Sequence, residues 1–100
     1  MDIKLTKEAV KDKKELSDQE WKEIKSKLKE VTNQLSHKDL KLISNPLLEH
    51  SIWQLTIDEE DSNHRAYLDV RNGRTVVVAI WNFEFTHQGD QHWEELKNRI

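Results

Sequence analysis

Residues 74–83 predict a strand that is apolar on both faces, which constrains the fold more than any other segment. In an extended conformation Val76, Val78 and Ile80 lie on one face and Val77, Ala79, Trp81 and Phe83 on the other. A strand with two apolar faces is either central and covered on both sides, or it awaits a partner molecule. A chain of 100 residues buries roughly two thirds of its unfolded surface, so one sheet and a few helices fit around this strand.

Two further segments alternate apolar and polar residues, as half-buried strands do. Residues 53–57 place Trp53, Leu55 and Ile57 on one face. Residues 65–70 place Ala66, Leu68 and Val70 on one face and Arg65, Tyr67 and Asp69 on the other. Asn72-Gly73 then favours a type I′ hairpin turn, because both residues tolerate positive φ values. Residues 58–63 predict a solvated acidic connection. The alternative, a cation-binding loop, lacks the glycine and the ligand spacing of an EF-hand.

The first third of the chain predicts helices. Ser17-Asp18-Gln19-Glu20 is a capping box, in which the serine and the glutamate each bind the other's backbone N–H. The apolar stripe that follows at helical spacing consists of Trp21, Ile24, Leu28, Val31 and Leu35. We expect this helix to dock on one side; a heptad seam is the alternative, but two heptads are too few to establish a coiled coil. Residues 2–5 predict a short strand, and Thr6 an N-cap for a short helix through Leu16.

The remaining segments complete an α+β pattern. Residues 36–51 look like a connection, with a turn at Asn45-Pro46, and Asp90 offers an N-cap for a helix that reaches Ile100. We therefore expect a single domain over residues 1–100 with a short N-terminal strand and two helices packed on a mostly antiparallel twisted sheet of about four strands. A short C-terminal helix should follow.

Composition narrows the possible functions. The chain has no cysteine, so it has no disulfide and no thiolate zinc site, which suits a reducing cytoplasm. The apolar run at 76–81 is too short to cross a bilayer, and the first residues lack the apolar stretch of a signal peptide. We therefore expect a cytoplasmic protein with no membrane contact.

The net charge of −3 hides an asymmetry. Residues 1–42 carry eleven lysines and nine carboxylates, whereas residues 43–100 carry five basic residues and ten carboxylates. Domains that bind nucleic acids usually have a strongly basic balance. The acidic second half therefore predicts little affinity for free RNA at physiological salt, because few cations are present to release counterions.

Four short segments carry a resemblance to a known family. They are Asp2-Ile3-Lys4-Leu5-Thr6 with Ala9 and Asp12, then Ile52-Trp53-Gln54-Leu55, then His64-Arg65-Ala66-Tyr67, and finally the apolar run Val76 to Phe83. In this order they resemble the opening strand and helix, the Trp-Glu-Leu-Arg strand, the Tyr-Arg-Val-Tyr strand and the strand before a Phe-x-Lys segment of the RelE/ParE superfamily. The resemblance to these toxin-antitoxin toxins, which include RelE, HigB and YoeB, covers nearly the whole chain.

The resemblance implies a function and a set of partners. Many members cleave mRNA on the ribosome, the ParE branch poisons DNA gyrase, and an antitoxin wraps and silences the toxin. The expected partners are thus a cognate antitoxin, in a toxin-antitoxin hetero-oligomer, and the ribosome with mRNA. Two basic positions of the family are absent here, because Thr56 replaces the arginine of the first motif and Glu84-Phe85 replace the lysines of the Phe-x-Lys segment.

Candidate residues exist for RNA cleavage without a metal or cofactor. Such cleavage needs a base, an acid and cations for the charge on the phosphorane. The resemblance assigns Arg65 to phosphate charge and His87 to proton transfer, while Arg71, Arg74 and His92 are candidates for nucleic-acid binding. A zinc site is rejected, since His87 and His92 have no further ligands.

Each candidate also has a structural interpretation. Arg65 would pair with a sheet carboxylate such as Asp69, His87 would be a polar loop residue, and His92 would lie in the first turn of a helix. The rings of Trp81, Phe83 and Phe85 would belong to the core or to a partner surface instead of stacking on bases.

Two hypotheses therefore stand. The first is a toxin with ribosome-dependent mRNA endonuclease activity that inhibits translation. The second is a non-enzymatic binding protein, either a gyrase-poisoning toxin or a catalytically decayed member, that acts through protein contacts. The apolar faces of residues 74–83 also lead us to expect a partner that covers part of the sheet or of the Trp21 helix.

Overall fold

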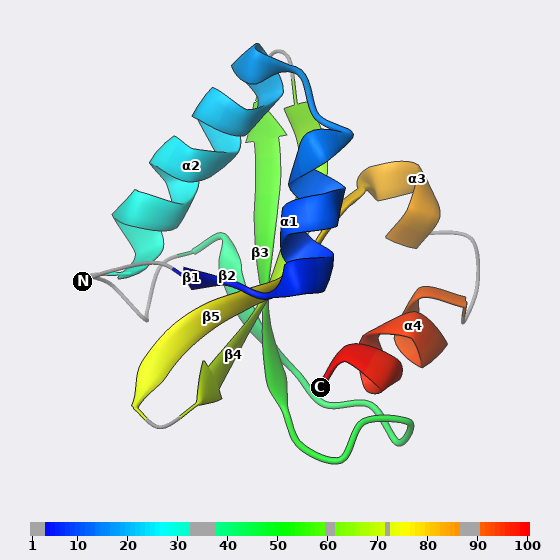
Figure 1. Ribbon diagram of the computed structural model, residues 1–100. Coiled ribbons are helices and arrows are strands. Elements are labelled where there is room, and N and C mark those ends of the chain that lie inside the picture. The colour runs from blue at the N-terminus through cyan, green and yellow to red at the C-terminus, as the bar shows by residue number, and fades with distance from the viewer. Residues whose placement is uncertain (1–3, 33–37, 60–61, 72, 87–90) are drawn as a thin grey trace.

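A mixed five-stranded sheet with helices on both faces makes up the described part of the chain (Figure 1). The computed structural model describes residues 4–32, 38–59, 62–71, 73–86 and 91–100. In chain order the elements are β1 (Lys4–Leu5), α1 (Lys7–Lys14), α2 (Asp18–Thr32), β2 (Leu40–Ile43), β3 (Ile52–Glu59), β4 (Ser62–Arg71), β5 (Arg74–Asn82), α3 (Phe83–Thr86) and α4 (Gln91–Arg99). The expected α+β class is confirmed.

The strands lie in the order β1-β5-β4-β3-β2. β1 pairs with β5 in parallel, and the other neighbours are antiparallel. The fifth strand is β2, which lies within the segment expected to be a connection. Its burial does not alternate, and Leu42 is 52% exposed, so the sequence gives no period-two signal for this edge strand.

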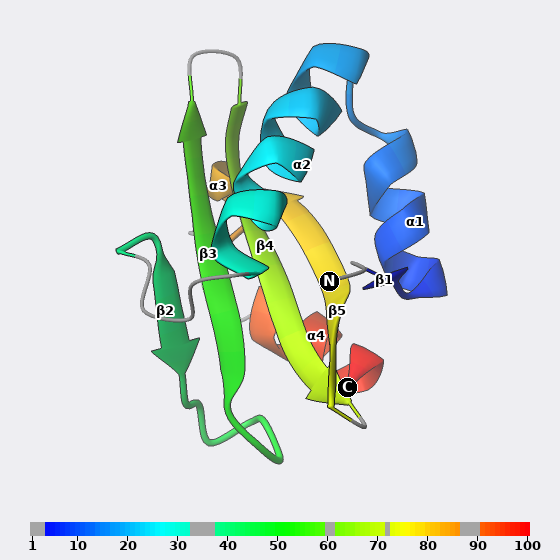
Figure 2. The ribbon, with the colours of Figure 1, turned by 90° about the vertical axis from the view of Figure 1, so that its left-hand side faces the viewer.

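The sheet separates two apolar cores. Between the sheet and α2 lie Ile24, Leu28 and Val31, packed against residues of β3 and β4 such as Leu55 and Ala66. On the opposite face, Leu96 of α4 packs with Tyr67, Val78, Ala79 and Trp81. Figure 2 shows α2 in front of the sheet and α4 behind it. Of the two alternatives for residues 74–83, the structure therefore shows a strand that is covered on both faces within the chain.

Coverage by α4 changes which side chains of β4 are buried. Tyr67 and Asp69, expected on the outer face, are buried, whereas Val70, expected inside, is 55% exposed. The strand does alternate, but its second face is a core as well. Sequence alternation therefore predicted the strand without predicting what would cover it.

A β-bulge interrupts the alternation of β5. Tyr67 pairs with Ala79 and Leu68 pairs with Val77, so Val78 has no partner on β4. Val78 and Ala79 consequently both face α4, whereas Val77 and Ile80 face the α2 core. The regular alternation expected for residues 74–83 is therefore wrong beyond Val78, since a bulge adds one residue to one strand and resets the faces.

The element ends follow the expected capping chemistry. Ser17 Oγ accepts the N–H of Glu20 at 3.1 Å, and Glu20 Oε1 accepts the N–H of Ser17 at 2.9 Å, which confirms the capping box. Thr6 Oγ1 accepts the N–H of Ala9 at 3.2 Å and begins α1. Gly73 has a φ of 75° in the β4–β5 hairpin.

The end of the chain differs in one detail. β5 ends at Asn82, whose Oδ1 accepts the N–H of Phe85 at 2.8 Å, so Phe83 begins α3 instead of ending the strand. The C-terminal helix is confirmed as α4, although its expected cap, Asp90, lies outside the described residues. Within the described ranges no helix combines the length and the apolar character needed to cross a membrane.

Candidate functional site

An open cleft of about 640 Å³ lies between α1, the first turn of α2, the end of β5 and α3. Its lining residues are Asp12, Glu15, Leu16, Glu20, Asn63, His64, Ile80, Trp81, Asn82, Phe83, Glu84 and Phe85. We call it the α1–α3 cleft. The cleft forms beside the last residues of β5, which extend beyond the two residues that pair with β1. The chain turns into α3 after Asn82, so one side of the end of β5 stays open.

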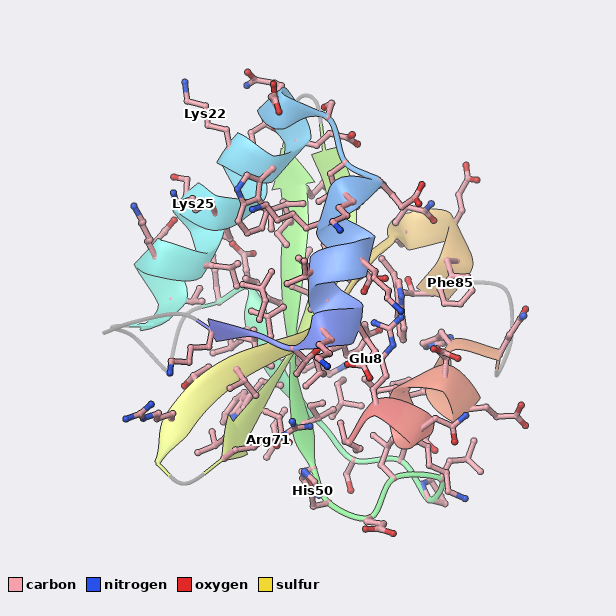
Figure 3. The ribbon with its side chains drawn as sticks, viewed as in Figure 1. Glu8, Lys22, Lys25, His50, Arg71 and Phe85 are labelled. Carbon is pink, nitrogen blue, oxygen red and sulfur yellow. The ribbon has the colours of Figure 1, made fainter. Side chains whose placement is uncertain are left out.

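The floor of the cleft is apolar. Ile80 and Trp81 are buried there, and the half-buried Phe83 and Phe85 follow from α3. The ring of Phe85 meets that of Trp81 edge to face, with centroids 5.0 Å apart. In Figure 3, Phe85 projects from α3 on the side that faces α4. Aromatic rings at this spacing give the floor a fixed shape.

The rim is acidic. Among the described lining residues four are carboxylates, Asp12, Glu15, Glu20 and Glu84, and none is lysine or arginine. Glu20 accepts the Ser17 N–H, and this hydrogen bond lowers the pKa of Glu20. Glu15 and Glu84 are exposed. Because like charges add their potentials in a partly enclosed space, the cleft favours cations.

One carboxylate of the rim has a structural role. Asp12 Oδ2 lies 2.6 Å from Nη1 of Arg99 and accepts the backbone N–H of Ile80 at 3.0 Å. Arg99 also donates to the carbonyl of Val78 at 3.0 Å and lies over the ring of Trp81. Burial alone would lower the pKa of Arg99, but hydrogen bonds and charges from Asp12 and Glu95 outweigh burial and raise that pKa. This network joins α1, β5 and α4 beneath the cleft.

His64 forms part of the wall and is buried. Its Nε2 lies 3.6 Å from Oε2 of Glu20. Burial lowers the pKa of His64, because the charged ring loses hydration; the Glu20 charge opposes this and the Arg65 charge adds to it. At neutral pH the ring is therefore uncharged and does not supply a cation to the cleft.

Arg65 lies beside the cleft and is half-buried. Its guanidinium sits 4.7 Å above the ring of Phe83 and donates to Asn63 Oδ1 at 3.3 Å and to the His64 carbonyl at 2.9 Å. The expected alternative, an ion pair with Asp69, is wrong. Asp69 instead accepts from Arg71 Nε at 3.1 Å and lies 3.0 Å from His50 Nε2.

The residues expected to bind nucleic acid do not gather around Arg65. Arg71 and Arg74 face each other at the β4–β5 hairpin, roughly 20 Å along β4 at the usual rise per residue. Arg71 is engaged by Asp69 and by the carbonyl of Arg99, whereas Arg74 is exposed.

The two candidate histidines are placed differently. His92 lies in the first turn of α4, as its structural interpretation expects, but it is 3% exposed. The centroid of its ring lies 4.4 Å from that of Trp93, with the two planes tilted by 41°, and the ring also lies near Tyr67, Trp81 and Phe85. This burial leaves His92 no surface to offer a phosphate. His87 lies outside the described residues, so its assignment to proton transfer stays a prediction.

No local sequence pattern marks the α1–α3 cleft. Glu20 was predicted as a helix cap and Asp12 as a family motif residue, and no role was predicted for Glu15. The missing signal is three-dimensional, since the rim joins residues 12–20 to residues 82–85. The described residues hold no group of three or more histidine and acidic side chains placed for a metal ion.

Comparison with protein-family models, with curated proteins and with solved structures found no match to this chain. The RelE/ParE resemblance therefore rests on motif order and spacing, and what it implies for function is a proposal.

Proposed function

We propose that the protein is a toxin of the RelE/ParE type that acts by binding another protein and not by cleaving RNA. The observation that carries this proposal is the charge of the α1–α3 cleft next to Arg65. Four carboxylates line the cleft, and the described lining residues include no lysine or arginine. An RNA phosphate that approached Arg65 through this cleft would meet net negative charge.

The surroundings of Arg65 add a second argument. Its partners across the sheet are Thr56 on β3 and Trp81 on β5. Thr56 occupies the position where the family motif carries arginine, so the missing cation would have stood directly beside Arg65. One guanidinium then has to stabilise all the charge of a phosphorane, and enzymes usually direct several donors at such a charge.

The toxin type is supported by the arrangement of elements and by exposed apolar side chains. Leu42 on β2 and Val70 on β4 are each more than half exposed, and an antitoxin chain that lay on the sheet would bury them. The proposal includes a cognate antitoxin that forms a hetero-oligomer with the toxin, and a cytoplasmic location.

Induction of the gene in bacteria tests the proposal. We expect growth inhibition with intact mRNA, because binding to a protein target leaves the message uncut. Primer extension on translated messages measures cleavage, and plasmid supercoiling measures whether gyrase is the target. Message cleavage in translating ribosomes would contradict the proposal.

A ribosome-dependent mRNA endonuclease is the second candidate, and the position of Arg65 favours it. The guanidinium is held by Phe83 and two oxygen acceptors without a carboxylate partner among the described residues. His87 would assist proton transfer, and the ribosome would present the RNA. If the protein is such an endonuclease, Arg65→Ala should lower the rate of mRNA cleavage by about 10²–10³-fold with little change in melting temperature. Substitution of an exposed residue, Lys97→Ala, should change neither quantity.

A further inference from the structure

We infer that the α1–α3 cleft is a docking site for a basic peptide segment of another protein. An apolar side chain of this segment enters the part of the cleft formed by Leu16, Phe83 and Phe85. Lysine or arginine side chains on either side of it meet Glu15 and Glu84. The inference names the chemistry of the partner and so rests on the proposed function of acting through protein contacts.

The apolar floor supplies affinity and shape. Leu16 and Phe85 are half-buried, and Phe85 is fixed by its edge-to-face contact with Trp81 at 5.0 Å. A partner side chain placed here removes apolar surface on both molecules from water. Full burial of one leucine changes affinity by roughly 10- to 100-fold, so a single anchor residue in the segment is enough to direct binding.

The available charges select a cation. Asp12 is neutralised by Arg99 at 2.6 Å, and Glu20 is engaged by the Ser17 N–H. Glu15 at the end of α1 and Glu84 on α3 are exposed and stand on different walls of the cleft. Two exposed carboxylates around an apolar floor complement a segment that carries basic side chains on both sides of an apolar one.

The edge of the sheet determines how the segment binds. β1 pairs with β5 only at Val76 and Val77, so the outer edge of β5 continues into the cleft. There the backbone N–H of Ile80 donates a hydrogen bond to Asp12 Oδ2 at 3.0 Å. This bond blocks the addition of a further strand at Ile80, so the segment docks through its side chains.

Fluorescence anisotropy with a defined probe tests the inference. The probe is a fluorescein-labelled peptide of alternating arginine and leucine, and the full chain is titrated into it at low and at physiological salt. We expect saturable binding that weakens with salt. A peptide with glutamate in place of arginine should not bind, and one with alanine in place of leucine should bind at least about tenfold more weakly.

A pair of charge-matched variants locates the site. Glu15→Gln with Glu84→Gln should weaken binding about tenfold, since each exposed ion pair contributes a factor of roughly two to five. Glu49→Gln with Glu94→Gln removes the same charge from exposed positions outside the cleft and should leave affinity within about twofold. Amide chemical shifts in nuclear magnetic resonance spectra should move at residues 12–16 and 80–86 but not at 40–43.

Besides failure of the peptide to bind, three outcomes would overturn the inference. They are equal affinity for the two double variants, shift changes confined to other residues, and tighter binding of a single-stranded RNA oligonucleotide in the same cleft. The proposed function has a separate readout. If the peptide fails to bind while induction still inhibits growth with intact mRNA, the inference is wrong and the proposed function stands. If the peptide binds but induction has no effect on growth, the proposed function is wrong instead.

Discussion

Asp12 and Arg99 are 87 positions apart in the sequence, yet Arg99 Nη1 lies 2.6 Å from Asp12 Oδ2. Both side chains are little exposed, at 13% and 11%. Removal of one partner from such a pair leaves a buried charge uncompensated. The pair therefore matters more to stability than the surface ion pairs around it.

Arg99→Met should lower the free energy of unfolding by about 3 kcal/mol, because Asp12 loses its cation while it still accepts the N–H of Ile80. Urea denaturation measures the change. Combining it with Asp12→Asn should recover part of the loss in a double-mutant cycle. Substitution of an exposed arginine, Arg74→Met, is the control and should change the free energy of unfolding little. If Arg99→Met lowered the free energy of unfolding no more than Arg74→Met, the Asp12–Arg99 pair would contribute nothing to stability.

His64 should make stability depend on pH. Its pKa is lowered from 6.5 in the folded protein, mainly by burial. The unfolded chain therefore binds more protons than the folded protein below pH 6.5, and the free energy of unfolding decreases as the pH is lowered through that range. The lowered pKa of Glu20 acts in the same direction, but only as the pH falls below 4.5.

His64→Asn should therefore flatten the decline in stability below pH 6.5, which urea denaturation across a pH series measures. An unchanged slope in His64→Asn would mean that His64 takes up its proton without opposition from the fold.

The strand face of a single residue could be predicted from the sequence, but its contact partners could not. Arg65 was placed on the face of β4 opposite Ala66, as the structure has it, because strand alternation is local. Its partners were not predicted, since Phe83 meets it only through the turn into α3 and Asn63 belongs to the segment 58–63 that was expected to be a connection. The Asp12–Arg99 pair could not be predicted, because a contact between residues so far apart in sequence produces no periodic pattern in the sequence.

At the scale of elements, the start of α2 shows what local signals predict well. Ser17 and Glu20 form the reciprocal bonds that their spacing indicates. Ser17→Ala should lower the free energy of unfolding by about 1 kcal/mol, measured by thermal or urea denaturation. Ser26→Ala, at an exposed position inside the same helix, should be neutral or slightly stabilising because alanine favours helix. Equal effects of the two substitutions would contradict the role of the cap.

Two other elements show why the rest could not be predicted. The half-exposed edge strand β2 has no alternation to detect, so residues 40–43 read as loop. The bulge at Val78 adds one residue to a run of valine and alanine in which every position is apolar. Such a run looks the same in either register, and only pairing with Tyr67 and Leu68 fixes the faces.

At the scale of the whole molecule, β4 and β5 belong to both cores. Leu28 is 1% exposed in the α2 core, and Leu96 is 0% exposed in the α4 core. Leu28→Ala and Leu96→Ala should each cost about 3 kcal/mol, which corresponds to roughly 10–20 °C in Tm for a domain of this size. Because the cores share strands, circular dichroism and tryptophan fluorescence should report one common transition in each variant.

Val10→Ala is the control for these variants, because Val10 is 39% exposed, and it should change Tm by only a few degrees. Separate transitions for the two probes in Leu96→Ala would show that α4 detaches while the α2 core stays folded. The sheet would then stabilise the two cores independently.

The parallel pairing of β1 with β5 can form only after residues 76 and 77 have been synthesised. Lys4 pairs with Val76, 72 positions further along the chain, and contacts between residues so far apart in sequence form late. The α1–α3 cleft needs Asp12 from one end of the segment between these residues, Phe83 and Phe85 just beyond the other, and Arg99 to neutralise Asp12. A nascent chain therefore has no assembled cleft until residue 99 has been made. Ribosome-bound chains that stop before residue 83 should therefore fail to bind the arginine–leucine peptide.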